Sequence, residues 1–307
     1  MSVLLRAAAC HHRGIMYPVT DHIDAPELRL ADGSPPSLDA LTSARMAVEA
    51  PPEEDLASFT LGSGSDVVFL PGLGFNHEPP TGVSRALESA LIVQLATHHA
   101  MHWLGRPRDL PTGVTIADIA DRTADFIAAR FGGPVPVIGF STGGLVALQL
   151  AISRPEVVSR LVVVGAAPRL SPEAAASERN WAEHLASGRV SEAWKLLADD
   201  YTRSPFLAGV LRVGLGTVGP WVTGADTADG VATGLADVAF DVRDRLGEIQ
   251  APTLLVAGER DQTIEAGDLA DAATRIPDCQ LLRLRLTGHV TSMLHPTTSR
   301  RIRTFLG

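Results

Sequence analysis

Short apolar runs alternate with segments that carry apolar residues at helical spacing from about residue 55 to the end of the chain. The apolar runs predict strands at residues 66–72, 100–105, 135–138, 160–168, 251–261 and 279–286. The intervening segments predict helices at residues 84–97, 115–131, 145–152, 265–275 and 297–306. Strands that alternate with helices form a mostly parallel sheet covered on both faces. The predicted fold class is therefore α/β.

Two stretches lie outside this alternation. Residues 7–44 show no sustained helical or strand period, so we expect residues 1–45 to form a poorly ordered extension, with a domain beginning at Met46. The alternation also stops over residues 166–246, where the sequence is helical in character and then rich in glycine.

The composition is that of a globular protein with a substantial core, with 45% hydrophobic and 20% charged residues. The net charge of −9 argues against broad binding to nucleic acid or to anionic membrane surfaces. No window of the sequence approaches the roughly 18 apolar residues of a membrane span. Two cysteines, Cys10 and Cys279, make neither a disulfide framework nor a metal-binding spacing. We therefore expect a cytoplasmic protein with a small-molecule substrate.

One strand-to-helix junction carries an unusual serine, in the sequence "VIGFSTGGLV". Serine is a common helix N-cap, and the simplest interpretation of Ser141 is that role. However, the junction leaves almost no residues for a loop, and Gly139 and Gly143 flank the serine. This pattern predicts a sharp, strained turn, and strain held at a polar residue suggests a function.

Three residues that could act together lie just after predicted strands. Ser141 follows the strand at 135–138, Asp261 ends "LLVAGERD", and His289 follows the last strand in "LRLTGHV". In open parallel sheets, functional sites form beyond the carboxyl ends of the strands. A serine nucleophile needs a base to take its proton and a carboxylate to orient that base. The combination indicates nucleophilic catalysis more strongly than any one of the residues does.

From about residue 55 to its end, the chain resembles the α/β-hydrolase fold family, with "GFSTG" as the nucleophile elbow. The resemblance implies an α/β-hydrolase fold in which Ser141 is the nucleophile, Asp261 the acid and His289 the base.

The resemblance also implies an oxyanion hole, made by two backbone N–H groups. One belongs to Thr142, and the other lies in the loop "LPGLGFNHEPPTG" after the first central strand. The family commonly has His-Gly where this chain has Pro71-Gly72, so the second donor would be Leu73, with Gly74 in reserve.

Family members insert a substrate-covering helical cap where this chain has residues 166–246. The resemblance thus divides the chain into a core, residues 46–165 and 247–307, and a cap. Three tryptophans of the cap suggest an apolar pocket, although each could equally pack within the protein; they are Trp181, Trp194 and Trp221. Four glycines are candidate hinges; they are Gly209, Gly214, Gly216 and Gly219.

The implied activity is that of a serine hydrolase. It would cleave a carboxylic ester, or a related lactone or thioester, of a small to medium apolar substrate through an acyl-enzyme, with no metal or cofactor. A serine at the elbow argues against relatives that use aspartate or cysteine there. Carbon–carbon bond hydrolases and cofactor-free haloperoxidase-like enzymes remain alternatives, as does a receptor-like binding protein that keeps the fold.

Other polar residues offer weaker alternatives. His295 is a less favoured base because "LHP" is typical of the start of the last helix, and Glu259 is a less favoured acid than Asp261. The run "HHAMH", residues 98–102, lacks a matched carboxylate or cysteine pattern, so we do not expect it to bind metal.

Overall fold

A computed structural model describes residues 56–198, 205–224 and 226–307, all within one compact unit, Ser37–Gly307. The expected extension, residues 1–45, and the expected start of the domain at Met46 lie outside the described residues.

Seven strands form a single sheet in the described part of the chain, in the order β1-β3-β2-β4-β5-β6-β7. The strands are β1 Leu56–Leu61, β2 Ser65–Leu70, β3 His99–Pro107, β4 Val135–Phe140, β5 Val158–Val164, β6 Thr253–Gly258 and β7 Cys279–Leu284. β1 pairs with β3 in the antiparallel sense, and each of the other neighbouring pairs is parallel. The prediction of a mostly parallel α/β sheet is confirmed.

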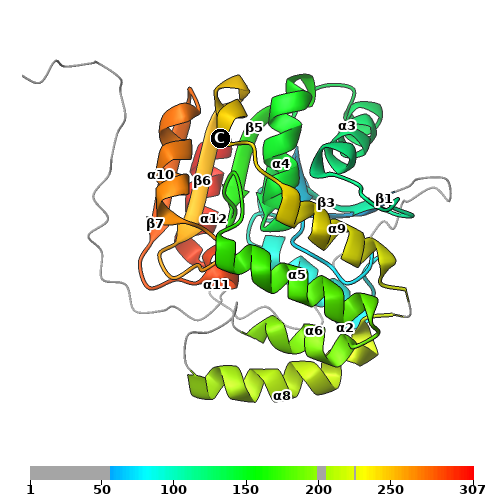
Figure 1. The fold of residues 1–307 in the computed structure, drawn as a ribbon. Helices are drawn as coiled ribbons and strands as arrows, with labels where there is room; N and C mark the ends of the chain where they lie inside the picture. The colour runs from blue at the N-terminus through cyan, green and yellow to red at the C-terminus, as the bar shows by residue number, and fades with distance from the viewer. Residues whose placement is uncertain (1–55, 199–204, 225) are drawn as a thin grey trace, which may run out of the picture. The chain divides into compact units, whose positions relative to one another are not determined.

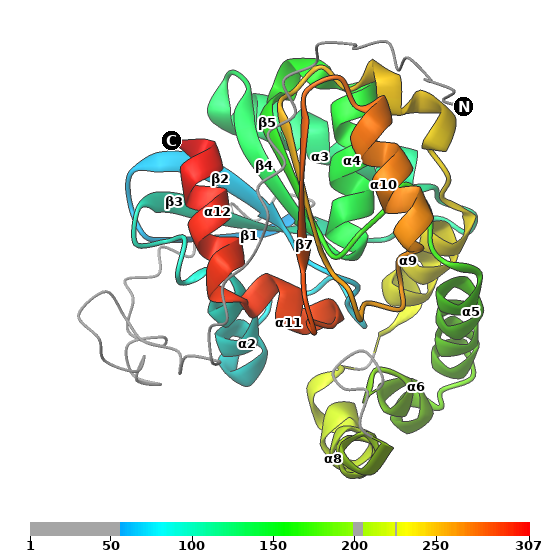
Figure 2. The same ribbon diagram turned by 90° about the vertical axis from the view of Figure 1, so that its left-hand side faces the viewer.

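Helices pack against both faces of the sheet, as the buried apolar runs of the central strands require (Figure 2). One face carries α3 Ile116–Phe131, α4 Thr142–Ser153 and α10 Ala266–Arg275. The other carries α2 Gly82–Ile92 and α12 Pro296–Leu306, with α11 His289–Leu294 between α12 and the end of β7.

Local sequence explains several of these boundaries. α3 begins at a capping box, in which Thr115 Oγ1 accepts from the Asp118 N–H and the Asp118 carboxylate accepts from the Thr115 N–H. It ends at Gly132, whose φ of 66° suits glycine. α4, in contrast, is apolar around its whole circumference, and its residues from Thr142 to Ile152 are buried.

The stretch between β5 and β6 contains helices and no strand among its described residues. Its described α-helices are α5 Pro172–Ala186, α6 Val190–Leu196, α8 Pro205–Val222 and α9 Ala228–Ala239. They lie beyond the carboxyl ends of the strands, with α5 and α9 next to the sheet and α6 and α8 farther out (Figures 1 and 2). A β-bridge between Arg169 and Asp241 joins the two ends of this insertion.

Two short 3₁₀ helices, η1 Pro155–Val157 and η2 Arg243–Glu248, complete the described elements. No helix within the described segments is both long enough and apolar enough to cross a membrane.

The sequence prediction missed β1 and α11. β1 is an edge strand whose alternation is imperfect, with buried side chains at both Leu56 and Ala57. α11 has six residues, too few for helical periodicity to be recognised. The predicted helix at 84–97 also ends earlier, at Ile92.

Candidate active site

Ser141 alone separates the end of β4 from the start of α4. Its φ of 54° and ψ of −126° lie in a region that non-glycine residues rarely occupy. A Cβ on Gly139 would lie 2.2 Å from the carbonyl oxygen of Gly143, and one on Gly143 would lie 2.1 Å from that of Leu70. Both flanking positions therefore require glycine, as the sharp turn predicted from the sequence implies.

The structure brings Ser141, Asp261 and His289 into one hydrogen-bonded chain. Ser141 Oγ lies 2.9 Å from His289 Nε2, and Asp261 Oδ2 lies 2.8 Å from His289 Nδ1. Asp261 lies just beyond β6, and His289 is the first residue of α11, which follows β7. Their position at the carboxyl edge of the sheet explains how residues up to 148 positions apart come together.

The carboxyl group of Asp261 is buried and remains suited to carry a negative charge. The N–H and the hydroxyl of Thr263 both donate to Asp261 Oδ1, at 2.9 and 2.7 Å. Burial on its own raises the pKa of Asp261, but the charge of His289 and the hydrogen bonds from His289 and Thr263 together hold that pKa below its usual value. Thr263 was not identified from the sequence; it lies two residues after Asp261 in "ERDQT".

The imidazole of His289 rests against two residues that end strands. Gly165 follows β5 with a φ of +64°, and a Cβ there would lie 3.3 Å from His289 Cε1. On another side, the ring of Phe140 lies 5.3 Å from the imidazole, centroid to centroid. These contacts limit where the ring can lie, so that its two nitrogens face the serine and the aspartate.

The two predicted oxyanion donors lie near Ser141. Thr142 is the first residue of α4, and Leu73 lies in the loop after β2; both line the cavity that contains Ser141. The same loop approaches the elbow closely, because a Cβ on Gly72 would lie 3.4 Å from Ser141 Cβ. Gly74 instead lies against Arg106, with a built Cβ 3.1 Å from Nη2.

A buried arginine holds this loop in place through hydrogen bonds. Arg106, near the end of β3, donates from Nη1 to the carbonyl of Pro71 at 3.0 Å and from Nε to His77 Nε2 at 3.2 Å. His77 Nδ1 lies 2.6 Å from the carbonyl oxygen of Pro107, so Nδ1 carries the proton and Nε2 accepts. Burial and the charge of Arg106 lower the pKa of His77 to about 3, which keeps this imidazole neutral.

The cavity beside Ser141 has a volume of about 100 Å³ and is mostly apolar. Its lining includes Leu73, Leu145, Ala166, Leu170, Leu196 and Leu197, together with two acidic residues, Glu178 and Asp237. Asp237 Oδ2 accepts a 2.5 Å hydrogen bond from the hydroxyl of Thr142. Burial raises the pKa of Asp237 to about 7, although Thr142, Arg106 and Glu178 partly offset this effect.

The three tryptophans of the insertion occupy different environments. Among the described residues, the cavity lining includes Trp181 but neither Trp194 nor Trp221. Trp194 stacks on Phe75 with ring centroids 4.3 Å apart, and its N–H donates to Thr223. Trp221 is 87% exposed on α8.

The candidate hinge glycines all lie inside α8. Gly219 and Gly216 lie where a Cβ would approach side chains of α6, 2.2 Å from Trp194 and 2.7 Å from Lys195. Their physical role is to let the two helices pack closely.

The alternative residues have other partners or face solvent. His295 caps α12 by accepting from the Thr297 N–H, as expected, and Glu259 is exposed. His98 bonds to Thr97, whereas His102 bonds to Thr60 and Asp66. In the described segments, no group of three or more His, Cys, Asp or Glu side chains is arranged to hold a metal.

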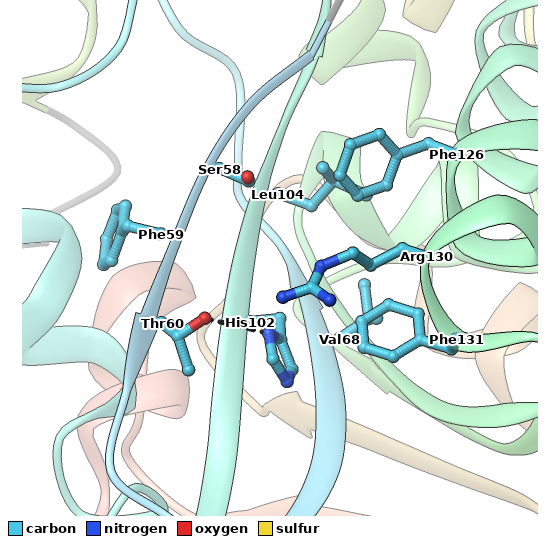
Figure 3. Close-up of a pocket in the computed structure, with 9 residues that line it drawn as sticks. All are labelled: Ser58, Phe59, Thr60, Val68, His102, Leu104, Phe126, Arg130 and Phe131. Atoms are coloured by element: carbon cyan, nitrogen blue, oxygen red, sulfur yellow. Dashed lines mark hydrogen bonds between the residues drawn. The ribbon is translucent and has the colours of Figure 1, made fainter. Parts of the chain in front are cut away.

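A second cavity of about 90 Å³ lies between the β1–β3 edge and α3 (Figure 3). Arg130 and the rings of Phe126 and Phe131 reach it from α3, and His102 faces it from β3. None of its lining residues belongs to the Ser141 chain.

Comparison with known proteins gives one family. A model described as "Alpha/beta hydrolase family" matches residues 67–299. Curated relatives include pimeloyl-[acyl-carrier protein] methyl ester esterase of Chromobacterium violaceum, 30% identical over 77% of this chain and 91% of that protein. The enzyme of the same name from Aromatoleum aromaticum is 33% identical over 75% of this chain and 93% of that protein.

Solved structures share the fold at lower sequence identity. A thermophilic esterase from Thermogutta terrifontis has a TM-score of 0.66 at 22% identity, over 85% of this chain and 96% of that chain. The α/β hydrolase MGS-M2, from a Medee basin deep-sea metagenome library, has a TM-score of 0.68 at 17% identity, over 85% of this chain and 97% of that chain.

Proposed function

The chain belongs to the alpha/beta hydrolase family, and from this premise we propose that it is a serine hydrolase that cleaves carboxylic esters through an acyl-enzyme. The observation that carries the proposal is the 2.9 Å contact between Ser141 Oγ and His289 Nε2, at a strained turn that leads into a cavity. Curated relatives named as methyl ester esterases support the same reaction class.

In the first half of the proposed reaction, Ser141 Oγ attacks the ester carbonyl carbon while His289 Nε2 takes the hydroxyl proton. Asp261 accepts a hydrogen bond from His289 Nδ1, which fixes the tautomer and stabilises the imidazolium. The tetrahedral intermediate then collapses: the bond to the alcohol oxygen breaks, His289 returns the proton to that oxygen, and the alcohol leaves.

In the second half, a water molecule replaces the alcohol. His289 takes a proton from the water as its oxygen attacks the acyl carbon. Collapse of this intermediate breaks the bond to Ser141 Oγ, which regains its proton from His289, and the carboxylic acid leaves. In both halves, the N–H groups of Leu73 and Thr142 are the proposed donors to the oxyanion.

The cavity supports a small to medium apolar acyl group. Trp181, Leu196 and Leu197 come from the helices of the insertion, so we propose that residues 166–246 are a cap over a core made by residues 46–165 and 247–307. The relatives named as methyl ester esterases favour a methyl ester as the bond that is cleaved. The low cysteine content supports a cytoplasmic location.

Covalent labelling tests the proposal. A fluorophosphonate should modify Ser141, as shown by peptide mass spectrometry, and turnover of p-nitrophenyl butyrate should fall by about 10³-fold or more in Ser141→Ala. Ser171 is a matched control, because it caps α5 and its hydroxyl hydrogen-bonds to backbone groups. Ser171→Ala should keep both the fluorophosphonate labelling and the turnover of the ester. Label on another serine, or undiminished turnover by Ser141→Ala, would overturn the proposal.

A further inference from the structure

Helix α9 of the insertion contacts both halves of the proposed oxyanion hole. Three of its residues, Gly230, Thr233 and Asp237, are spaced by three and then four positions and so lie on one face of the helix. All three are buried. This face is directed at the loop that carries Leu73 and at the elbow that carries Thr142.

On the loop side, α9 packs against backbone. A Cβ on Gly230 would lie 2.4 Å from the carbonyl oxygen of Phe75, so glycine is required for this close approach. One turn later, the hydroxyl of Thr233 lies 3.2 Å from His77 Nε2, which also accepts from Arg106. Arg106 in turn holds the carbonyl of Pro71. The loop is therefore bonded to α9 through His77 and Arg106.

On the elbow side, α9 makes a short hydrogen bond to the first residue of α4. Asp237 Oδ2 accepts from the hydroxyl of Thr142, whose own N–H is the other proposed oxyanion donor. Asp237 is 1% exposed. Of the two carboxylates whose charge acts on Arg106, Asp237 has the larger effect. Arg106, which holds the loop, and Asp237, which holds the elbow, therefore attract each other.

We propose that Asp237, through Thr142, and Arg106, through Pro71 and His77, are positioning residues that hold the two oxyanion donors in register across α9. Their hydrogen bonds to Thr142, Pro71 and His77 make them act through other residues. The inference rests on the proposed function, because the donors act only if Ser141 attacks a carbonyl.

Such positioning should matter mainly for the rate of the chemical step. Oxyanion donors stabilise charge that appears only in the transition state, so small displacements lower kcat more than they change KM. Asp237→Ala removes the acceptor, and Thr142→Val removes the donor while keeping the shape and the backbone N–H. We expect each to lower kcat roughly 10- to 100-fold, with KM changed less than 3-fold.

The decisive measurement is a double-mutant cycle on p-nitrophenyl butyrate hydrolysis and on the rate of fluorophosphonate labelling. Because both residues act through one hydrogen bond, Asp237→Ala with Thr142→Val should lose little more than either change alone. Asp237→Asn, which can still accept from Thr142, should recover most of the loss seen in Asp237→Ala. Asp229→Ala on the same helix removes a carboxylate that binds the backbone of Asp109 and Leu110, and it should keep kcat.

Two results would overturn the inference. One is a change in kcat of less than 3-fold in both Asp237→Ala and Thr142→Val. The other is a double variant whose loss of kcat equals the product of the two single losses. If Asp237→Ala does not fold, two other variants still test the inference. Thr142→Val should lose activity, and Asp237→Asn should largely keep it. Ser141→Ala separates the two proposals: full turnover by that variant removes the proposed function, whereas an inactive Ser141→Ala beside a fully active Asp237→Ala removes only this inference.

Discussion

The burial of apolar side chains differs between the parallel sheet and helix α8 of the insertion. In β5, Leu161, Val162, Val163 and Val164 are all fully buried between two layers of helix. In α8, Phe206 is 83% exposed and Trp221 is 87% exposed. In the sheet, an apolar sequence therefore indicates burial, whereas in α8 of the insertion it does not. α5 and α9 of the insertion lie next to the sheet, and each places one acidic residue, Glu178 or Asp237, in the lining of the Ser141 cavity.

Two aspartates, one from each region, differ in the pKa of their carboxyl groups. Asp261 belongs to the sheet edge and Asp237 to the insertion, and both are buried; Asp261 contacts His289, and Asp237 lines the cavity beside Ser141. Hydrogen bonds and the charge of His289 hold the pKa of Asp261 below its usual value, whereas burial raises that of Asp237. One site thus holds one carboxyl group suited to be ionised and another that binds a proton more tightly.

The largest expected effect is that of Asp261→Asn. An amide at this position donates to His289 Nδ1 or leaves the wrong tautomer favoured, so the base no longer faces Ser141 correctly. By analogy with serine proteases we expect kcat to fall on the order of 10⁴-fold. Steady-state kinetics with p-nitrophenyl butyrate checks this, with Glu259→Gln as the exposed control. An inactive Glu259→Gln beside a nearly normal Asp261→Asn would show that the acid is Glu259.

The tryptophans of the insertion sharpen the contrast between buried and exposed apolar residues. Trp181 is 2% exposed and packs against Phe75, so Trp181→Ala should destabilise the protein by about 3–5 kcal/mol. Trp221→Ala should change stability by less than about 0.5 kcal/mol, because the indole is almost fully exposed. Urea unfolding measures both.

Trp181 also lines the cavity, so its loss should alter substrate preference. Each added methylene that is buried contributes roughly 0.8 kcal/mol, so activity should rise from acetate to butyrate to hexanoate esters until the cavity is full. Trp181→Ala should flatten that series, and Trp221→Ala should not. A preference of the wild type for acetate would mean that the cavity does not accommodate the acyl chain.

Two glycine substitutions should have opposite signs in the two regions. Gly143→Ala places a Cβ 2.1 Å from the carbonyl oxygen of Leu70 and should destabilise the protein by about 3 kcal/mol. A Cβ on Gly214, in α8, meets nothing within 4 Å, so Gly214→Ala should stabilise by up to about 1 kcal/mol through helix propensity. Thermal unfolding compares them directly. Equal effects would mean that the elbow is not as tightly packed as the sheet around it.

The sequence predicts the sheet and the site with unequal success, for physical reasons. The buried strands and the sharp turn at Ser141 leave local patterns, because β-branched runs and flanking glycines are needed there whatever surrounds them. Asp261 and His289 follow strands directly, so the topology alone places them at one edge. The sequence therefore places these residues at the edge where the structure brings them together.

Arg106, His77 and Asp237 leave no comparable pattern. Each is a single ionisable residue whose partners lie on other elements, and the Asp237–Thr142 bond spans 95 positions. One local signal was available: Thr233 and Asp237 share the face of α9 on which Ala236 and Phe240 pack into the core, an unusual place for an aspartate. The tertiary contacts were needed to assign it a role.

The smallest expected effect is on stability, and its sign separates the two aspartates. The pKa of Asp237 is higher in the folded protein than in the unfolded chain, so the unfolded chain releases its proton first as pH rises, and wild-type stability falls between about pH 4 and pH 7. Asp237→Asn lacks this ionisation, so its stability should rise relative to that of the wild type as pH increases from 4 to 8, with little difference at pH 4.

Asp261 should behave in the reverse manner. Its pKa is lower in the folded protein, so its contribution is present at neutral pH and is lost as pH falls through that value. Asp261→Asn should therefore be less stable than the wild type at pH 8, with the difference shrinking toward acid pH. Urea unfolding of the three proteins at pH 4, 6 and 8 measures both trends. If Asp237→Asn also loses stability at pH 8, Asp237 is ionised and well paired in the fold, and the insertion then supports its carboxylate as the sheet edge supports that of Asp261.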